Sequence, residues 1–188
     1  MKKLITLATI VLITNIATAQ LRLRDAVYPY TLAEQQDTLK LHGMGIRKNI
    51  TTDLYAGGLY TESKMTDPNE IINSAEDMGI RLIILSKKID QKSIIKTFDK
   101  GFVNATNDNT VPIQQEIATL MSIFETEVQK NDVFDFIYTQ ERGLNVYKNG
   151  QVLGNVQGLE FKKTLFNIWL GEKPVCKYIK EGMLAVEG

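Results

Sequence analysis

The dipeptide Asn149-Gly150 lies between two segments of alternating apolar and polar residues, and it restricts the fold more than any other local feature. Asn-Gly favours a two-residue hairpin turn with positive φ at both residues, so the flanking segments are expected to pair as antiparallel strands. Residues 133–139 form a further strand-like segment directly before this hairpin. The sequence therefore predicts an antiparallel sheet in the C-terminal half of the chain.

Helical patterns separate and follow the predicted strands. Asp67-Pro68-Asn69-Glu70 has the N-cap, proline and acidic residue typical of a helix start, and Gly79 predicts where that helix ends. Leu82-Ile83-Ile84-Leu85 is an unbroken apolar run, typical of a central strand. Apolar residues at helical spacing predict further helices over residues 90–105, 113–128, 159–170 and 174–184. This order favours the α+β class, with a large antiparallel sheet and a layer of helices on one face.

The first 19 residues have the composition of a bacterial secretory signal peptide. Lys2 and Lys3 precede an apolar run, and Ala17-Thr18-Ala19 forms a small-x-small cleavage site before Gln20. The run is shorter than the roughly 20 residues that a spanning helix needs, and an uncleaved anchor is the alternative. We expect an exported protein, periplasmic or secreted, with a single domain over residues 20–188 and no membrane span in the mature chain. We also expect it to be a monomer.

The composition argues against several kinds of partner and site. Cleavage after Ala19 removes two of the 22 basic residues and leaves 20 against 22 acidic ones, so no general positive charge favours nucleic acid. His42 is the only histidine and Cys176 the only cysteine, which argues against a histidine metal site and an internal disulfide. We therefore predict no metal and no cofactor. Alternation with Leu39 and Leu41 places His42 on a solvated or edge face of its strand.

The segment LHGMGIRKNITTDLYAGGLYTESK, residues 41–64, contains the best candidate for a functional site. Gly43, Gly45 and Arg47 share one face of a predicted strand, and Tyr55 shares a face of the next strand with Gly57. If these strands pair, a guanidinium and a phenol border a groove floored by bare backbone. An arginine is suited to holding a carboxylate or polarising a carbonyl. The alternative is a structural arginine in an ion pair, with the tyrosine in the core.

Three motifs of the chain resemble the chalcone isomerase superfamily, particularly its exported bacterial chalcone-isomerase-like members. They are LHGMGIRK, LYAGGLYTESK and LFNIWLGEKPVCKYIKEGMLA, and they occur in the expected order and spacing. The resemblance covers about Leu32 to Ala185. It implies an open-faced β-sandwich, in which a ligand cleft lies between a large antiparallel sheet and its helical layer.

The resemblance also bears on what the cleft holds. The catalytic arginine of plant chalcone isomerases corresponds to Arg47, but their threonine corresponds to Tyr55 and their later hydroxyl residue to Ile168. Their tyrosine and asparagine have no match between Ser86 and Phe102. Without these oriented donors, true chalcone isomerase activity is not expected. Fatty-acid-binding members keep an arginine and a tyrosine in these positions, which implies non-catalytic binding of a fatty acid or similar amphiphilic anion.

Three functions are open at this point. In the first, Arg47 and Tyr55 hold the acidic head group of an acyl chain. Its candidate ligand-binding residues are Arg47, Tyr55, Gly43, Gly45, Gly57, Phe98, Phe102 and Trp169, with Leu120, Phe124 and Phe166 as further apolar lining. In the second, an isomerase or intramolecular lyase uses Arg47 as electrophile on an unidentified substrate. In the third, the role is structural, the cleft is filled, and Arg47 pairs with an internal carboxylate such as Asp53 or Glu62.

Overall fold

In the computed structural model of the chain, residues 20–34 and 37–185 are described, and the predicted signal peptide lies outside them. The centre of the fold is a seven-stranded sheet with the order β3-β4-β5-β6-β7-β8-β9, in which every neighbouring pair is antiparallel. Its strands are β3 (Thr31–Glu34), β4 (Asp37–Lys48), β5 (Asp53–Thr61), β6 (Met78–Ile84), β7 (Val133–Thr139), β8 (Gly143–Lys148) and β9 (Gln151–Val156). The turn between β8 and β9 has positive φ at both Asn149 and Gly150, as the dipeptide predicts.

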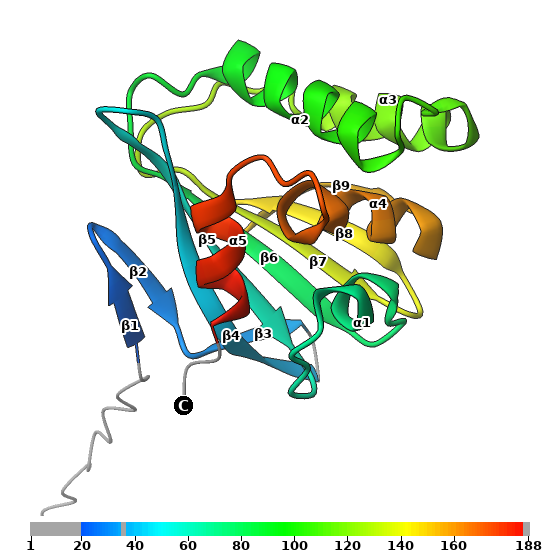
Figure 1. Ribbon diagram of the computed structural model, residues 1–188, viewed down its shortest axis with the longest axis horizontal. Helices are drawn as coiled ribbons and strands as arrows, with labels where there is room; N and C mark the ends of the chain where they lie inside the picture. The colour runs from blue at the N-terminus through cyan, green and yellow to red at the C-terminus, as the bar shows by residue number, and fades with distance from the viewer. Residues whose placement is uncertain (1–19, 35–36, 186–188) are drawn as a thin grey trace, which may run out of the picture.

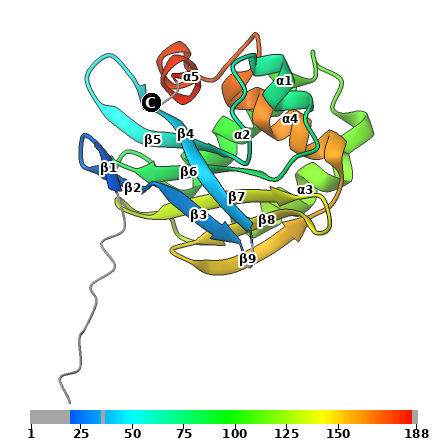
Figure 2. The same cartoon turned by 90° about the horizontal axis from the view of Figure 1, so that it is seen from below.

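The helices cover one face of the sheet (Figure 1). They are α1 (Pro68–Asn73), α2 (Gln91–Ala105), α3 (Gln114–Ile123), α4 (Leu159–Leu170) and α5 (Lys177–Leu184), with a 3-10 turn at Val111–Ile113. The other face is covered in part by a hairpin of β1 (Gln20–Leu23) and β2 (Ala26–Pro29), which lies beside β4 and β5 in Figure 2. The α+β class and the sheet with one helical layer are therefore confirmed.

Aromatic side chains fill the space between the sheet and the helical layer. The Phe98 ring on α2 lies within 6.2 Å, centroid to centroid, of Phe102, Phe124, Phe136 and Trp169. Each of these five side chains is at most 2% exposed. Such clusters stabilise a core through their large buried area and through the geometry of ring contacts.

Helix α5 lies directly on the glycine-rich parts of β4 and β5. A Cβ atom on Gly45 would overlap the carbonyl oxygen of Ile179, and one on Gly57 would overlap the Met183 side chain. A Cβ atom on Gly43 would meet the last carbonyls of the same helix. The predicted open groove over Gly43, Gly45 and Gly57 is thus occupied by α5, and this expectation is corrected. The physical reason is that bare backbone admits a close helix as readily as a ligand.

A buried lysine joins α4 to the end of α1. The Lys162 side chain is 0% exposed, and its Nζ donates to the carbonyl oxygens of Ile71, Ile72 and Ser74 at 3.0, 3.1 and 2.9 Å. An ammonium group has three N–H donors, so these three carbonyls use all of them. Desolvation by burial lowers the pKa of this lysine to about 7.

The structure departs from the predicted elements at several places, among them the helix predicted over residues 113–128, which ends at Ile123. The first helix ends at Asn73, because Met78 and Gly79 already pair with β7 as part of β6. The predicted irregular lead-in contains the β1–β2 hairpin. His42 is 4% exposed, not solvated, because a bulge between Leu41 and Gly43 interrupts the alternation of β4.

Candidate functional site

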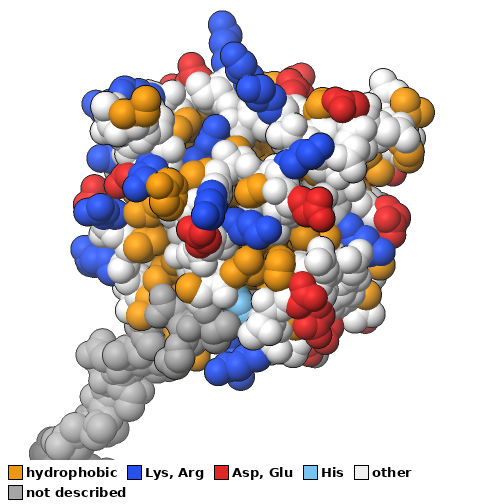
Figure 3. Space-filling view, in the orientation of Figure 1, with side chains coloured by type: hydrophobic (Ala, Val, Ile, Leu, Met, Phe, Trp, Pro, Cys, Tyr) orange, Lys and Arg blue, Asp and Glu red, His pale blue; other side chains and the backbone are white. Residues whose placement is uncertain are grey.

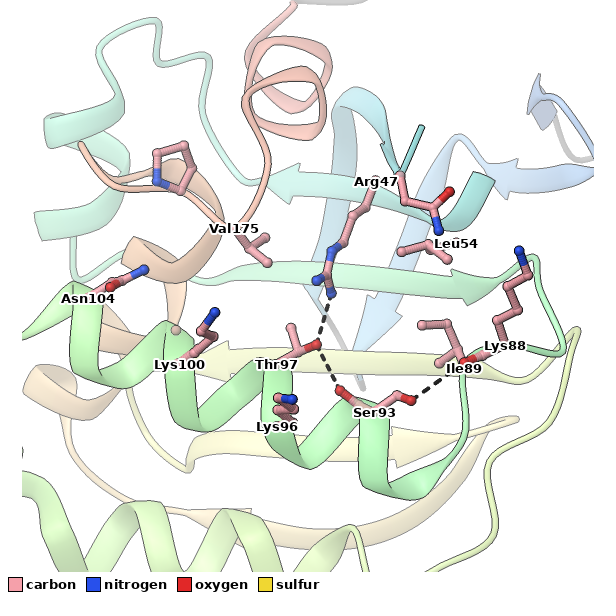
Figure 4. Close-up of a pocket in the computed structure, with 13 residues that line it drawn as sticks. Arg47, Leu54, Lys88, Ile89, Ser93, Lys96, Thr97, Lys100, Asn104 and Val175 are labelled. Carbon is pink, nitrogen blue, oxygen red and sulfur yellow. Dashed lines mark hydrogen bonds between the residues drawn. The ribbon is translucent and has the colours of Figure 1, made fainter. Parts of the chain in front are cut away.

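Two cavities meet at Arg47, between the ends of β4 and β5 and the helix α2. The residues that line the outer cavity are drawn in Figure 4. The outer cavity has a volume of about 600 Å³, within the range of ligand sites. The inner cavity is a slot of about 10 Å³ between the sheet and the helices, with room for about one water molecule. Arg47, Ile89 and Thr97 line both cavities, so the guanidinium lies at their junction.

Strand pairing places Arg47 opposite Tyr55. In the antiparallel ladder of β4 and β5 the two residues are direct partners, and the guanidinium carbon lies 5.4 Å from the centroid of the phenol ring. Arg47 Nη1 donates to Thr97 Oγ1 at 2.9 Å, and this hydroxyl donates in turn to the carbonyl oxygen of Ser93 at 2.8 Å (Figure 4). The guanidinium is therefore held across the space between sheet and α2, while most of its five N–H donors remain for a ligand.

The Tyr55 hydroxyl has a free proton in the inner cavity. Trp169 Nε1 lies 3.0 Å from the Tyr55 oxygen, and an indole N–H can only donate, so the tyrosine oxygen accepts this bond. Among the described residues, no acceptor for the Tyr55 O–H is found. Burial raises the pKa of Tyr55 above its ordinary value, and the Arg47 charge opposes this shift. At neutral pH the group is a hydrogen-bond donor and not a base.

The described residues give Arg47 no carboxylate partner. Asp53, one of the two acids that the structural alternative names, forms its ion pair with Arg24 at 3.5 Å. No ion pair joins Arg47 to Glu62 or to any other described acid. A half-buried cation at a cavity junction is thus left with an incomplete set of protein partners.

The inner cavity is lined almost wholly by apolar side chains. Phe98 and Trp169 belong to this lining, as does Tyr55. Its other apolar members are Leu82, Ile84, Ile89, Ile94, Phe124, Phe134 and Phe136. Phe102 does not line it and instead stacks on Phe161, with ring centroids 5.6 Å apart. Gly43, Gly45 and Gly57 line neither cavity, because α5 covers them.

The outer cavity is basic. Four cationic side chains line it, those of Arg47, Lys88, Lys96 and Lys100, and its described lining contains no Asp or Glu. Lysine and arginine side chains project over α2 and the neighbouring strand ends in the space-filling view (Figure 3). Our sequence reasoning did not identify these lysines or Thr97. The sequence does contain an indication of a basic helix face, because lysines recur every four residues from 88 to 100.

The described residues also bear on metal binding and on membrane insertion. Over residues 20–34 and 37–185, no three His, Cys, Asp or Glu side chains are grouped so that they would hold a metal ion. Within the same ranges, none of the helices combines the length and apolar character needed to cross a bilayer.

Comparison with known proteins agrees with this architecture. The sequence profile of a family described as chalcone isomerase-like matches residues 20–185. The crystal structure of a fatty-acid binding protein from Arabidopsis thaliana superposes with a TM-score of 0.71. The match covers 89% of this chain and 96% of the plant chain, at 18% sequence identity, so it shows a shared fold. No curated protein matches the sequence.

Proposed function

This chain belongs to the chalcone isomerase-like family, and from that premise we propose that it binds a fatty acid or a similar amphiphilic anion. In this proposal Arg47 and Tyr55 hold the acidic head group, and the alkyl chain lies between the sheet and α2. The fold shared with a fatty-acid binding protein supports binding of a small lipid.

One observation carries the proposal: the guanidinium of Arg47, which has no carboxylate partner among residues 20–34 and 37–185, lies where a basic cavity meets an apolar one. An amphiphilic anion has the same two-part character. A carboxylate at this junction accepts charge-assisted hydrogen bonds from Arg47 and a further bond from the free O–H of Tyr55. Its chain then points toward Phe98 and Trp169.

The volume of the inner cavity adds a condition to the proposal. A slot of about 10 Å³ holds no alkyl chain, so the lining rings must move when the chain enters. Phe98, which contacts four other aromatic rings and lies on α2, is the side chain that most restricts this space. Binding therefore includes a rearrangement of the aromatic cluster.

The isomerase alternative is less well supported by the site. Ring closure or proton transfer needs a base near the substrate at working pH. The titratable side chains of the inner lining are Arg47, which is always charged, and Tyr55, whose pKa is raised by burial. Donors for an oxyanion are present among these residues, but a base is not.

Trp169 offers a direct test, because it is the single tryptophan and lines the inner cavity. Delipidated protein is titrated with dodecanoate and with dodecanoate brominated on its chain, while calorimetry measures binding and tryptophan fluorescence reports position. We expect saturable binding, with strong quenching by the brominated ligand only. Absence of binding heat together with unquenched fluorescence would rule out the proposal.

We further propose that the mature protein is an exported, single-domain monomer that begins at Gln20. The residues concerned, 1–19, lie outside those described. The mass of the protein isolated from the periplasm or medium of a bacterial host tests the cleavage site, and sedimentation tests the oligomeric state.

A further inference from the structure

The outer cavity carries more positive charge than a single carboxylate uses. The guanidinium of Arg47 balances the single negative charge of a carboxylate, yet three more cations, Lys88, Lys96 and Lys100, line the same cavity. Asn49, Ser93 and Asn104 add polar groups to this lining, and no acid is among the described lining residues. The head-group region is thus built for an anion of higher charge than a fatty acid.

Two of these lysines, Lys96 and Lys100, have no acidic partner among the described residues. Lys148, Lys163 and Lys177 each pair with an acid, whereas Lys96 and Lys100 form no ion pair within the described residues. The two lie four residues apart on α2, and like charges at this spacing destabilise a helix. The chain as a whole has a formal charge of zero, so a basic cavity is not a by-product of a basic composition.

The positions of the cations define the shape of the anion. Arg47 lies at the inner end of the outer cavity, Lys88 lies beside the start of α2, and Lys96 and Lys100 lie along that helix (Figure 4). Lys88 Nζ is held at 3.0 Å from Thr52 Oγ1, which leaves it two further donors. A group with several charged oxygens pointing in different directions fits this arrangement better than a planar carboxylate does.

We propose that the ligand is a phosphate monoester of an apolar chain, with its dianionic phosphate in the outer cavity. The guanidinium of Arg47 donates two parallel hydrogen bonds to two phosphate oxygens. The ammonium groups of the lysines attract the remaining phosphate oxygen and balance the second negative charge. This inference rests on the proposed function, because the chain still enters the inner cavity. It changes the ligand class from fatty acid to phosphorylated lipid or lipid-like ester.

The test compares three ligands of equal alkyl length: dodecyl phosphate, dodecyl sulfate and dodecanoate. Binding is measured by calorimetry below the micellar concentration at pH 8, where a phosphate monoester with a second pKa near ~6 is a dianion. The proteins are the wild type, Lys96→Gln/Lys100→Gln and the matched control Lys92→Gln/Lys130→Gln. Both control lysines are exposed and line neither cavity.

We expect the wild type to bind dodecyl phosphate about 10-fold more tightly than the two monoanions, which corresponds to about 1.4 kcal/mol. The Lys96→Gln/Lys100→Gln variant should lose this preference, and the control pair should keep it. Lowering the pH to 5.5 should weaken dodecyl phosphate alone, because the ligand then becomes a monoanion. Equal affinity for the three ligands, or an equal loss for all three in the lysine variant, would overturn the inference while the proposed function stands.

Two further outcomes would contradict either the proposed function or the assignment to a phosphate ester. If none of the three amphiphiles binds, the proposed function itself fails. If inorganic phosphate binds as tightly as dodecyl phosphate, the cavity takes free phosphate and the assignment to a lipid-like ester is wrong. We expect inorganic phosphate to bind at least ~100-fold more weakly, because it buries no apolar surface.

Discussion

Arg47 and Tyr55 are direct partners across β4 and β5, and the guanidinium carbon lies 5.4 Å from the centre of the phenol ring. The strand ladder thereby sets a charged, forked donor against an aromatic face that also carries a free O–H. A cation over a ring is attracted by the ring's negative face. The pair is thus positioned by backbone hydrogen bonds, and a ligand does not have to organise it.

Arg47→Ala should weaken dodecanoate binding about 10- to 100-fold, since hydrogen bonds to a charged group contribute roughly 1.5–3 kcal/mol. Calorimetry measures the affinity, and thermal unfolding should show little change because Arg47 is only half-buried. Arg22→Ala, at an exposed arginine on β1, is the matched control and should bind normally. Equal affinities for the two variants would remove Arg47 from the site.

Tyr55→Phe should destabilise the fold by about 1–3 kcal/mol, because it leaves the buried indole N–H of Trp169 without its acceptor. Urea unfolding of Tyr55→Phe, Trp169→Phe and the double variant forms a double-mutant cycle. We expect a coupling energy of about 1 kcal/mol. Strictly additive losses would mean that this hydrogen bond contributes nothing to stability.

Phe98→Ala should increase the affinity for dodecanoate although it destabilises the protein by about 3–5 kcal/mol. The deletion enlarges the inner cavity, so the chain enters without displacing rings. Phe102→Ala is the control, because Phe102 is equally buried on the same helix but does not line that cavity. It should lose similar stability and gain no affinity. A gain of equal size in both variants would show that general loosening, and not the cavity, controls binding.

Gly45→Ala should destabilise the protein by ~3 kcal/mol and loosen α5, because the added methyl group overlaps the Ile179 carbonyl. Faster amide hydrogen exchange over residues 177–184 would report the loosened helix. Gly79→Ala provides the comparison, since its added Cβ has its nearest neighbour at 3.5 Å, an ordinary contact. It should change the unfolding free energy by less than about 1 kcal/mol.

Lys162 should make stability depend on pH between about 7 and 10. Burial lowers its folded-state pKa to about 7, against about 10.4 in an unfolded chain. In this window the unfolded state binds more protons, so stability rises with pH by up to about 1.4 kcal/mol per unit. Relative to Lys162→Met, the wild type should therefore gain stability from pH 7 to pH 10 in urea titrations. Parallel curves for the two proteins would show that the lysine stays charged, as its three carbonyl partners favour.

Local patterns in the sequence predicted much of the fold correctly. The Asn149-Gly150 turn identified a hairpin. Strand parity grouped Arg47 with Gly45 and Tyr55 with Gly57, because side chains alternate with a period of two, and the observed register brings the two groups together. That rule fails at His42, where the bulge beside Gly43 adds a residue and brings the imidazole into the interior. A bulge leaves no reliable mark in one sequence, so the burial of His42 was not predictable.

The glycine-rich strands could not be interpreted from their own residues. Gly43 and Gly45 leave a bare surface, and only the fold decides whether a helix or a ligand occupies it. A residue far along the chain indicates the helix. Gly182 is unfavourable within a helix, and because it has no side chain, α5 can contact β4 at Met44. The basic outer cavity was not predicted for a related reason. The net charge of the chain is zero, and it does not reveal that the fold places several lysines around one cavity.

The close packing of α5 on β4 also affects the order in which parts of the fold can form during synthesis. Gly43 and Gly45 leave the ribosome long before Ile179 and Gly182, so this strip of sheet stays uncovered until the segment that forms α5 has been synthesised. The linker that carries Pro174 and Val175 to the outer cavity arrives at the same late stage. A nascent or prematurely terminated chain therefore exposes an apolar, adhesive strip, which calls for a chaperone to shield it. The wall of the outer cavity is therefore complete only after Pro174 and Val175 have been synthesised, more than a hundred residues after Arg47.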